Sequence, residues 1–381
     1  MKEAETSADF RGQKRKMEAE TKTLSESGAL LLETVRGIRR PDESFRQAVI
    51  ERWDSLCKPL GGFGQLEDLI AQIGMIQRTE HPHLNKRAVV IMGADNGVVR
   101  EGVSQCGSEV TAQVLENMGM RKSSVCVLSE ALRADVFPVN IGMNVDASHP
   151  RVRNCAVRHG TGNIAEGPAM EREEAILAVE TGIRMAGELK KQGYDLCVAG
   201  EMGIGNTTTS GACVCSLFSV VPEKIAGPGA GLSKAGVRKK AEVIRRALSV
   251  NQPNPNDPID VLAKVGGLDL AGLCGLYLGC AFHSLPILID GFISAVSADL
   301  AFRISKDALP YFLPSHESGE EGAKLVLQDL GLSGPIRAGM HLGEGTGAVL
   351  CLGLLDQILT VYEHLPRFEE SSVEKYHHFD Q

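Results

Sequence analysis

A glycine-rich turn that contains a carboxylate is the part of this sequence best suited to chemistry. Residues 195–209 read DLCVAGEMGIGNTTT. The apolar run at 196–199 predicts a strand, and the small and hydroxyl residues after the turn favour the start of a helix. Backbone N–H groups converge on an anion at such a helix N-terminus. Asn206 stands where a nucleoside triphosphate loop needs lysine, so we expect one phosphate rather than a triphosphate.

Glu201 lies within this turn. Its charge would repel a phosphate unless it faces a cation or a proton donor. The turn therefore predicts a phosphorylated small molecule with chemistry next to it. A plain glycine-rich crossover turn explains the turn taken alone equally well.

Apolar runs that end in special turns alternate with helical patterns along most of the chain. We expect strands at 88–92, 136–141, 196–199 and 285–289, and helices at 110–118, 172–192, 233–249 and 319–330, with a last helix ending near residue 362. This order predicts an α/β fold, a parallel sheet with helices on both faces. Ligands bind at the carboxyl ends of such strands, so one pocket could collect the turn residues Asp95, Gly160, Glu201, Asp290 and Glu344.

The sequence before residue 86 is helical in pattern, with expected helices at 27–35, 42–56 and 65–77. We therefore divide the chain into a charged tail (1–24), a smaller helical subdomain (25–85), a catalytic α/β domain (86–350) and a C-terminal helix and tail (351–381). The apolar stretch 268–296 is interrupted by polar residues and Pro286, so it predicts a buried helix and then a buried strand rather than a membrane span.

Composition excludes several classes of protein. A net charge of -8 argues against a general nucleic-acid binder. The charged residues 2–22 do not form a secretory signal. None of the ten cysteines forms a Cys-x-x-Cys pair, and most lie among apolar residues. We expect reduced thiols in the cytoplasm and no metal site.

Several motifs between residues 58 and 350 are specific when taken together. They are Lys58-Pro59 with its glycine loop, residues 94–98 (ADNGV), 109–111 (EVT), 162–164 (GNI), 200–207 (GEMGIGNT), 290–292 (DGF) and 342–347 (LGEGTG). In these motifs the chain resembles the nicotinate-nucleotide:dimethylbenzimidazole phosphoribosyltransferases, which build the lower-ligand nucleotide of cobalamin-type cofactors. The resemblance implies a dimeric enzyme with a Rossmann-like core and no cofactor. Its substrates would be nicotinate mononucleotide and an aromatic base.

The resemblance also implies roles for single residues. Glu344, set between glycines, corresponds to the general base, and Glu201 could tune it or stabilise positive charge on the ribose. The phosphate would lie on Gly203, Ile204, Gly205, Asn206 and Thr207, with Lys240 nearby. Asp95, Cys106, Val114, Gly162, Asp290 and Leu342 would contact substrate. Without the resemblance, Glu344 is more readily an exposed or helix-capping side chain than a base. Lys240 is then as readily a solvated side chain, and each of the two aspartates as readily a cap of the next helix.

The departures from the family pattern cluster on the expected acceptor side. His341 replaces the usual arginine, Asn96 replaces histidine, Val114 is apolar, and residues 102–108 lack the usual proline. We therefore hypothesise an unusual acceptor such as a phenol, which heterodimeric members of the family use. Two other hypotheses stay open: a non-catalytic partner subunit, and an oxidoreductase suggested by the glycines at 227–231.

Overall fold

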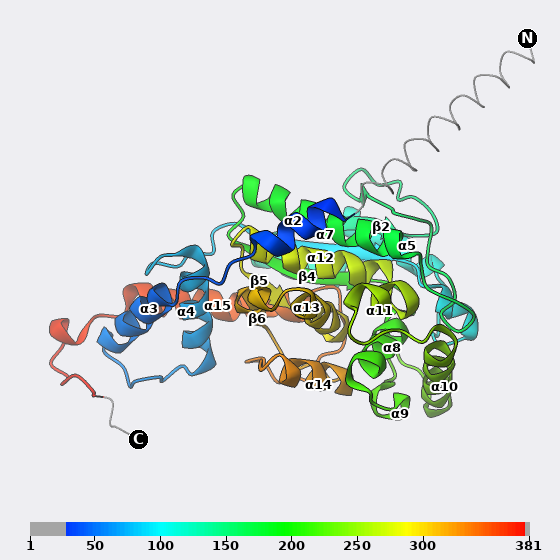
Figure 1. Cartoon of the computed structure of the whole chain (residues 1–381). Helices are drawn as coiled ribbons and strands as arrows, with labels where there is room; N and C mark the ends of the chain where they lie inside the picture. Colours follow the sequence, from blue (N-terminus) through cyan, green and yellow to red (C-terminus); the bar gives the residue numbers. More distant parts are fainter. Residues whose placement is uncertain (1–27, 378–381) are drawn as a thin grey trace, which may run out of the picture.

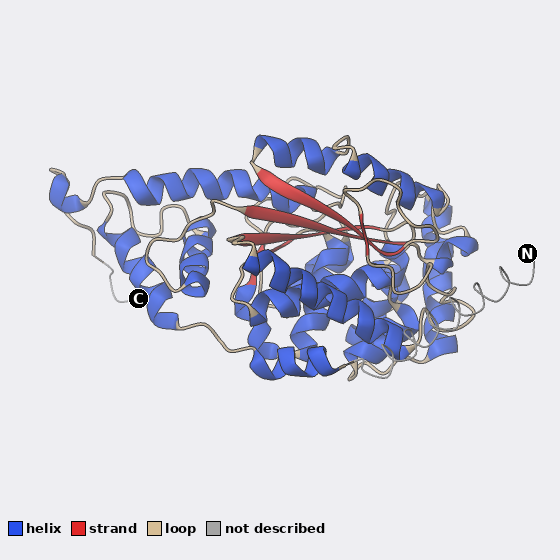
Figure 2. Ribbon diagram, turned by 90° about the horizontal axis from the view of Figure 1, so that it is seen from above, coloured by secondary structure: helices blue, strands red, loops and turns tan. Residues whose placement is uncertain are grey.

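Six parallel strands form a single sheet in the order β3-β2-β1-β4-β5-β6 (Figure 1, Figure 2). The structure is a computed structural model and describes residues 28–377. The strands are β1 (Arg87–Ala94), β2 (Ala134–Gly142), β3 (Arg153–Asn154), β4 (Leu196–Met202), β5 (Ile287–Ile289) and β6 (Phe312–Pro314). The predicted parallel sheet is confirmed, and its strands twist across one another in Figure 2.

Alternate residues of the central strand pack into two separate hydrophobic clusters. Val90 and Met92 of β1 belong to one cluster, and Val89 and Ile91 belong to the other. All four side chains are fully buried. A strand buried on both faces has no need of polar alternation, which explains the continuous apolar runs in the sequence.

The larger cluster is built mainly by α7 (Arg172–Lys191) and α12 (Leu268–Phe282), which lie against each other over one face of the sheet (Figure 1). A Cβ at Gly275 would collide with the backbone of Val179, so the two helices approach as closely as glycine allows. The same cluster holds residues of α2 (Ala29–Gly37), α8 (Asn206–Phe218), α9 (Pro222–Ile225), α10 (Lys234–Asn251), α11 (Pro258–Val265), α13 (Phe292–Ile304) and α14 (Glu321–Asp329).

The other face is covered by α5 (Glu109–Gly119), α6 (Ser124–Ala131) and α15 (Thr346–His364). Beside α15 lie α3 (Glu43–Ser55) and α4 (Gln65–Gln77), at the left in Figure 1. The rings of Trp53 and Tyr362 join these helices, with centroids 4.7 Å apart. The segment before residue 86 is thus shared between both faces, since α2 packs on α7 and α12. The expected tail at 1–24 lies outside the described residues, and the expected boundary at 350 falls inside α15.

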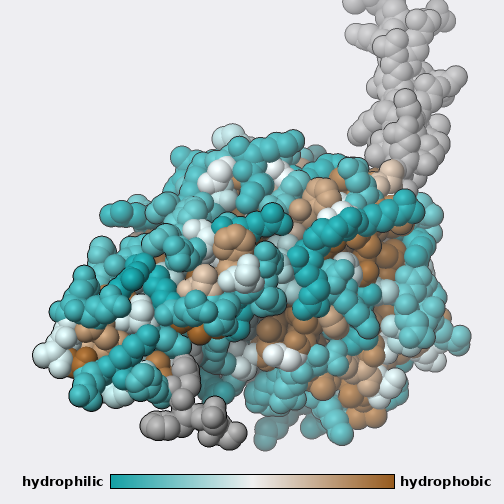
Figure 3. Space-filling view, turned by 60° about the vertical axis from the view of Figure 1, so that its left-hand side comes forward, coloured by the Kyte–Doolittle hydropathy of each residue, from teal (hydrophilic) through white to brown (hydrophobic). Residues whose placement is uncertain are grey.

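Among residues 28–377, α15 is the one helix long and apolar enough to cross a membrane. Val349, Leu352 and Leu355 of this helix are fully buried in the cluster beneath the sheet. Its apolar character is therefore that of a core helix. On the face shown in Figure 3, hydrophilic side chains predominate and apolar ones lie between them in patches.

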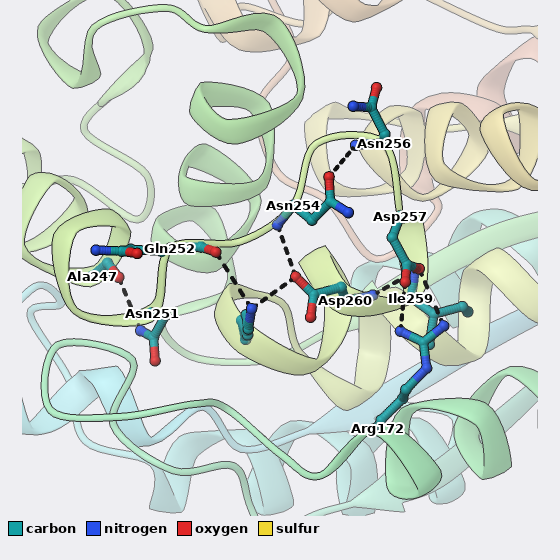
Figure 4. Close-up of polar contacts among 10 residues, drawn as sticks. Arg172, Ala247, Asn251, Gln252, Asn254, Asn256, Asp257, Ile259 and Asp260 are labelled. Carbon is teal, nitrogen blue, oxygen red and sulfur yellow. Dashed lines mark hydrogen bonds and ion pairs between the residues drawn. The ribbon is translucent and has the colours of Figure 1, made fainter.

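The connection from α10 to α11 is fixed by a polar network (Figure 4). Asp257 accepts hydrogen bonds from two backbone N–H groups in the first turn of α11 and pairs with Arg172 of α7 at 2.8 Å. The backbone N–H of Asn254 donates to Asp260 at 2.8 Å. These bonds hold the end of α10 against the sheet-covering helices, and α10 is the helix that carries Lys240.

Candidate active site

A cavity of about 250 Å³ opens at the carboxyl ends of the central strands. Its walls come from the turn after β4, the segments after β5 and β6, helix α10 and the glycine loop before α15. Ten of the site residues predicted from the sequence line it: Glu201, Gly203, Ile204, Gly205, Asn206, Thr207, Lys240, Asp290, Leu342 and Glu344. Four others do not: Asp95, Cys106, Val114 and Gly162.

One end of the cavity is suited to an anion. Helix α8 begins there at Asn206, directly after Gly205, whose φ is 94°. Lys240 is only 1% exposed, and its Nζ donates to Thr207 Oγ1 and to the carbonyl of Gly227, both at 3.0 Å. Burial lowers the pKa of Lys240 to about 8. A buried ammonium beside a helix N-terminus makes this end positive.

The loop that carries Glu344 has a strained backbone. Gly343, Glu344 and Gly345 have φ values of 86°, 59° and 80°, all in the left-handed region. Asp290 holds the loop, because its carboxylate accepts hydrogen bonds from Gly345 N at 3.1 Å and Ala348 N at 2.9 Å. Asp290 thus caps α15, and not the helix α13 that follows it directly in the chain, as the sequence had suggested.

The carboxylate of Glu344 is poised to accept a proton. Its Oε2 is buried and has no hydrogen-bond partner among the described residues. Burial, with a contribution from the nearby charge of Asp290, raises the pKa of Glu344. A carboxylate without donors is more basic than one held by hydrogen bonds, which suits a general base.

Glu201 shares one amide with a second buried carboxyl group. The Nδ2 of Asn206 donates to Glu201 and also to Asp269, the latter at 3.0 Å. Burial, followed by the charge of Asp269, raises the pKa of Glu201 to about 8. Glu201 is therefore protonated near neutral pH, which removes the repulsion toward phosphate expected from the sequence. A Cβ at Gly343 would lie 2.6 Å from Glu201 Oε1, so Glu201 lies directly against the glycine loop.

The sequence patterns did not single out Asp269, which accepts a hydrogen bond from the cavity residue Asn206. Asp269 lies on α12, is fully buried, and has a pKa raised by burial to about 6. It is the one charged residue within α12, and it was interpreted only as an interruption of an apolar stretch. A lone acid on a helix that is otherwise buried is the signal that could have found it.

Asp95 lies behind the turn that follows β4 rather than in the cavity. Its carboxylate accepts hydrogen bonds from Asn144 N at 2.8 Å and from the hydroxyl of Thr111. The oxygen of Thr111 in turn accepts the backbone N–H of Ile204 at 3.2 Å. Of the five turn residues expected to share a pocket, Asp95 and Gly160 do not line it.

The other three predicted residues that do not line the cavity, Gly162, Val114 and Cys106, contact other parts of the protein instead. The backbone N–H of Gly162 donates to Ala169 at 2.7 Å, Val114 of α5 packs against the cluster beneath the sheet, and Cys106 contacts Ser104. Their predicted substrate contacts stay predictions. Leu342 is 58% exposed and lies at the mouth of the cavity.

Among residues 28–377, no group of three or more His, Cys, Asp or Glu side chains is arranged to hold a metal ion. All ten cysteines are free thiols. The buried ammonium of Lys240 and the unpartnered Oε2 of Glu344 make the cavity suited to a phosphorylated ligand and to proton transfer.

Comparison with known proteins agrees with this chemistry. Residues 38–373 match the family model DBI_PRT, described as a phosphoribosyltransferase. The chain belongs to this phosphoribosyltransferase family. Two relatives are named nicotinate-nucleotide–dimethylbenzimidazole phosphoribosyltransferase. The one from Ruminiclostridium cellulolyticum is 44% identical over 90% of this chain and 98% of its own length. The one from Acetivibrio thermocellus is 42% identical, over 91% and 99%.

A solved structure has the same fold. The crystal structure of the enzyme of that name from Thermus thermophilus is 34% identical and superimposes with a TM-score of 0.82. The match covers 88% of this chain and all of the other. The family resemblance expected from the sequence motifs is confirmed by the family match and by these relatives.

Proposed function

We propose that this enzyme transfers phosphoribose from nicotinate mononucleotide to an aromatic base, releasing nicotinate and an α-linked ribotide. The observation that carries the proposal is the unpartnered carboxylate of Glu344, which lines the same cavity as the buried ammonium of Lys240. In this proposal the ammonium of Lys240 holds the phosphate, and the carboxylate of Glu344 faces the aromatic acceptor. The names of the two relatives support these two substrates.

The reaction needs few protein groups. The bond between C1′ and the pyridinium nitrogen breaks, and its electron pair neutralises the departing ring, so no acid is required. A nitrogen of the acceptor attacks C1′ from the opposite face, which turns a β-nucleotide into an α-nucleotide. Glu344 takes the proton of the acceptor. Fixing the phosphate makes this attack effectively intramolecular, an advantage of several kcal/mol.

Glu201 acts on Glu344 rather than on the phosphate in this proposal. Protonated Glu201 lies against Gly343 and leaves Glu344 as the ionised carboxylate of the pair. Two adjacent carboxyl groups with separated pKa values divide the acid and base roles between them. Asp269 supports this division through Asn206.

We infer that the acceptor is 5,6-dimethylbenzimidazole, as the names of the relatives suggest, and a phenol is the second candidate. The apolar rim residue Leu342 and the exposed His341, where the family usually has arginine, favour a less polar acceptor site. Mass spectrometry of the products from nicotinate mononucleotide with dimethylbenzimidazole, phenol or p-cresol separates the two. A ribotide of dimethylbenzimidazole alone excludes the phenolic version.

The substitution Glu344→Gln tests the catalytic assignment. We expect kcat to fall by roughly 10²–10⁴-fold, the usual contribution of a general base, while the affinity for nicotinate mononucleotide changes little. Retention of full turnover would exclude Glu344 as the base. Absence of nicotinate release by the purified chain would instead favour the non-catalytic partner subunit.

We propose further that the enzyme is a dimer and that it is located in the cytoplasm, where its free thiols would stay reduced.

A further inference from the structure

His316 is a cavity residue that neither the sequence motifs nor the proposed mechanism uses. It follows β6 in the chain and is 3% exposed. Its side chain lines the same cavity as Glu344 and Lys240. Burying a polar imidazole costs free energy unless its nitrogens find hydrogen-bond partners, so we ask which partners His316 has.

The hydrogen bonds around His316 define its tautomer. The hydroxyl of Ser315 donates its single hydrogen to the carbonyl of Ile289. The oxygen of Ser315 lies 2.9 Å from His316 Nδ1, and it has no second hydrogen to offer. Nδ1 must therefore carry the hydrogen and donate it to Ser315. Burial lowers the pKa of His316, so the ring is neutral and Nε2 presents a lone pair.

The imidazole has little freedom to turn away. A Cβ at Gly347 would collide with the ring, so the first turn of α15 packs directly on it. A Cβ at Gly334 would collide with the backbone of His316 on the other side. The next residue, Glu317, donates its backbone N–H to Ile336 at 2.9 Å. The acceptor atom Nε2 is thus held in place before any ligand binds.

His316 contacts the Glu344 end of the cavity, and a short segment of chain links it to the Lys240 end. On one side it contacts Gly347, in the helical turn that follows Glu344. On the other side the chain runs from His316 to Glu320, whose charge acts on Lys240 at the phosphate end. The part of a nucleotide that lies between its phosphate and its reacting carbon is the ribose, which carries two hydroxyl donors.

We propose that Nε2 of His316 accepts a hydrogen bond from a ribose hydroxyl of the donor nucleotide, and that this bond makes the enzyme selective for ribonucleotides over deoxyribonucleotides. The inference rests on the proposed function and adds a specificity determinant to it. A neutral imidazole suits this task because it accepts a hydrogen bond without adding charge beside the carboxyl groups.

The test combines substrate and protein changes in a double-mutant cycle. Nicotinate mononucleotide and its 2′-deoxy and 3′-deoxy analogues are compared with the unchanged enzyme and with His316→Asn. The asparagine amide can occupy the place of Nδ1 and donate to Ser315, but it offers no acceptor at the position of Nε2. His316→Gln, which can place an oxygen near that position, is the rescue variant.

We expect the unchanged enzyme to lose about tenfold in kcat/KM with one of the two deoxy donors, as a single buried hydrogen bond implies. His316→Asn should lose a similar factor with the ribonucleotide and nothing further with that deoxy donor. His316→Gln should recover part of the loss. Equal losses with ribose and deoxyribose donors would overturn the inference and assign His316 a structural role.

Two outcomes separate this inference from the proposed function. If the unchanged enzyme releases nicotinate but accepts both deoxy donors as readily as the ribonucleotide, the inference fails and the function stands. If it releases no nicotinate with any acceptor, both fail. The comparison of donors on the unchanged enzyme needs no variant, so equal use of the three donors would overturn the inference even if His316→Asn does not fold, and His316→Gln then supplies the assignment to His316.

Discussion

The carboxylate of Asp290 accepts a hydrogen bond of 3.1 Å from the backbone N–H of Gly345, a residue 55 positions away in the sequence. This bond ties the end of β5 to the loop that carries Glu344. The loop has three consecutive residues with positive φ, an arrangement that neighbouring contacts must maintain. Asp290 is thus a positioning residue for the proposed base.

Replacing Asp290 with asparagine should separate positioning from substrate binding. The amide has one acceptor oxygen, so one of the two backbone N–H groups now bound by Asp290 loses its partner. We expect the free energy of unfolding to fall by about 1–2 kcal/mol, as for the loss of a helix cap. We also expect kcat to fall at least about tenfold as Glu344 shifts, measured by nicotinate release, with the affinity for phosphate retained.

Asp257→Asn is the matched control for this experiment. Asp257 caps α11 through one oxygen: its Oδ1 accepts hydrogen bonds from Ile259 N at 3.1 Å and Asp260 N at 3.2 Å, its Oδ2 pairs with Arg172 at 2.8 Å, and it does not line the cavity. Asparagine can keep both capping bonds but loses the ion pair with Arg172, so we expect a stability loss of up to about 1 kcal/mol with unchanged kcat. If Asp290→Asn and Asp257→Asn lower kcat by the same factor, the loss in Asp290→Asn results from general destabilisation of the fold and not from a shift of Glu344.

The raised pKa of Glu201 predicts how stability depends on pH. The ordinary pKa of a glutamate is 4.5, whereas that of Glu201 in the fold is about 8, so between these values the folded protein holds a proton that the unfolded chain has released. The free energy of unfolding therefore decreases as pH rises through this window, with a slope of at most about 1.4 kcal/mol per pH unit. Glu201→Gln should reduce the slope, measured by urea unfolding between pH 6 and 8, above the pKa of about 6 of Asp269.

Glu188→Gln is the control for the pH experiment. Glu188 forms a half-exposed ion pair with Arg153, which lowers its pKa below 4.5. Its titration is complete at lower pH, so its removal should leave the slope unchanged. An unaltered slope in Glu201→Gln would show that Glu201 is ionised in the folded protein.

Lys240 should govern the affinity for phosphate. Lys240→Met keeps the length and the apolar stem but removes the ammonium that bonds Thr207 and Gly227. We expect inorganic phosphate and nicotinate mononucleotide to bind about 10- to 100-fold more weakly, since charge-assisted hydrogen bonds are lost. Because the pKa of the free enzyme's Lys240 is about 8, phosphate affinity should also decline above that pH. Titration calorimetry measures both effects.

The neighbouring Lys239 provides the comparison. It lies on the same helix with an exposed side chain and does not line the cavity. Lys239→Met removes the same charge from the protein, so it reports any long-range effect of net charge. Equal weakening in both variants would place the phosphate away from Lys240.

The sequence could predict the sheet and the turns that line the cavity, because both depend on local properties. Apolar runs ending in glycine located the central strands, and α4 spans the expected residues 65–77. The expected strand at 196–199 extends to Met202, so Glu201 lies on β4 rather than in the turn. Helix α13 was not predicted, because a helix buried on all sides shows no polar periodicity. The two-residue β3 and the three-residue β6 were not predicted, whereas the three-residue β5 was, because it lies inside the longer apolar run 285–289.

The missing part of the site depends on tertiary packing. Asp269 and Asn206 are 63 residues apart, and only the contact between α12 and the start of α8 brings them together. His316 likewise belongs to the cavity because α15 folds back over the end of β6. No local motif encodes such contacts. The glycines are different, because a positive φ is a local requirement that the sequence displays.

Replacing Gly343 should impair both stability and activity. Its φ is 86°, and an added Cβ would lie 2.6 Å from Glu201 Oε1. Gly343→Ala therefore combines backbone strain with displacement of a buried carboxyl group. We expect a loss of about 2–3 kcal/mol in the free energy of unfolding and at least about tenfold in kcat.

Gly331→Ala is the control, because its φ of 67° imposes strain but the added Cβ meets no atom within 4 Å. Gly331→Ala should lose about 1 kcal/mol and no activity. Urea unfolding and nicotinate release measure the two quantities. Full activity in Gly343→Ala would mean that the contact between this loop and Glu201 does not position the base.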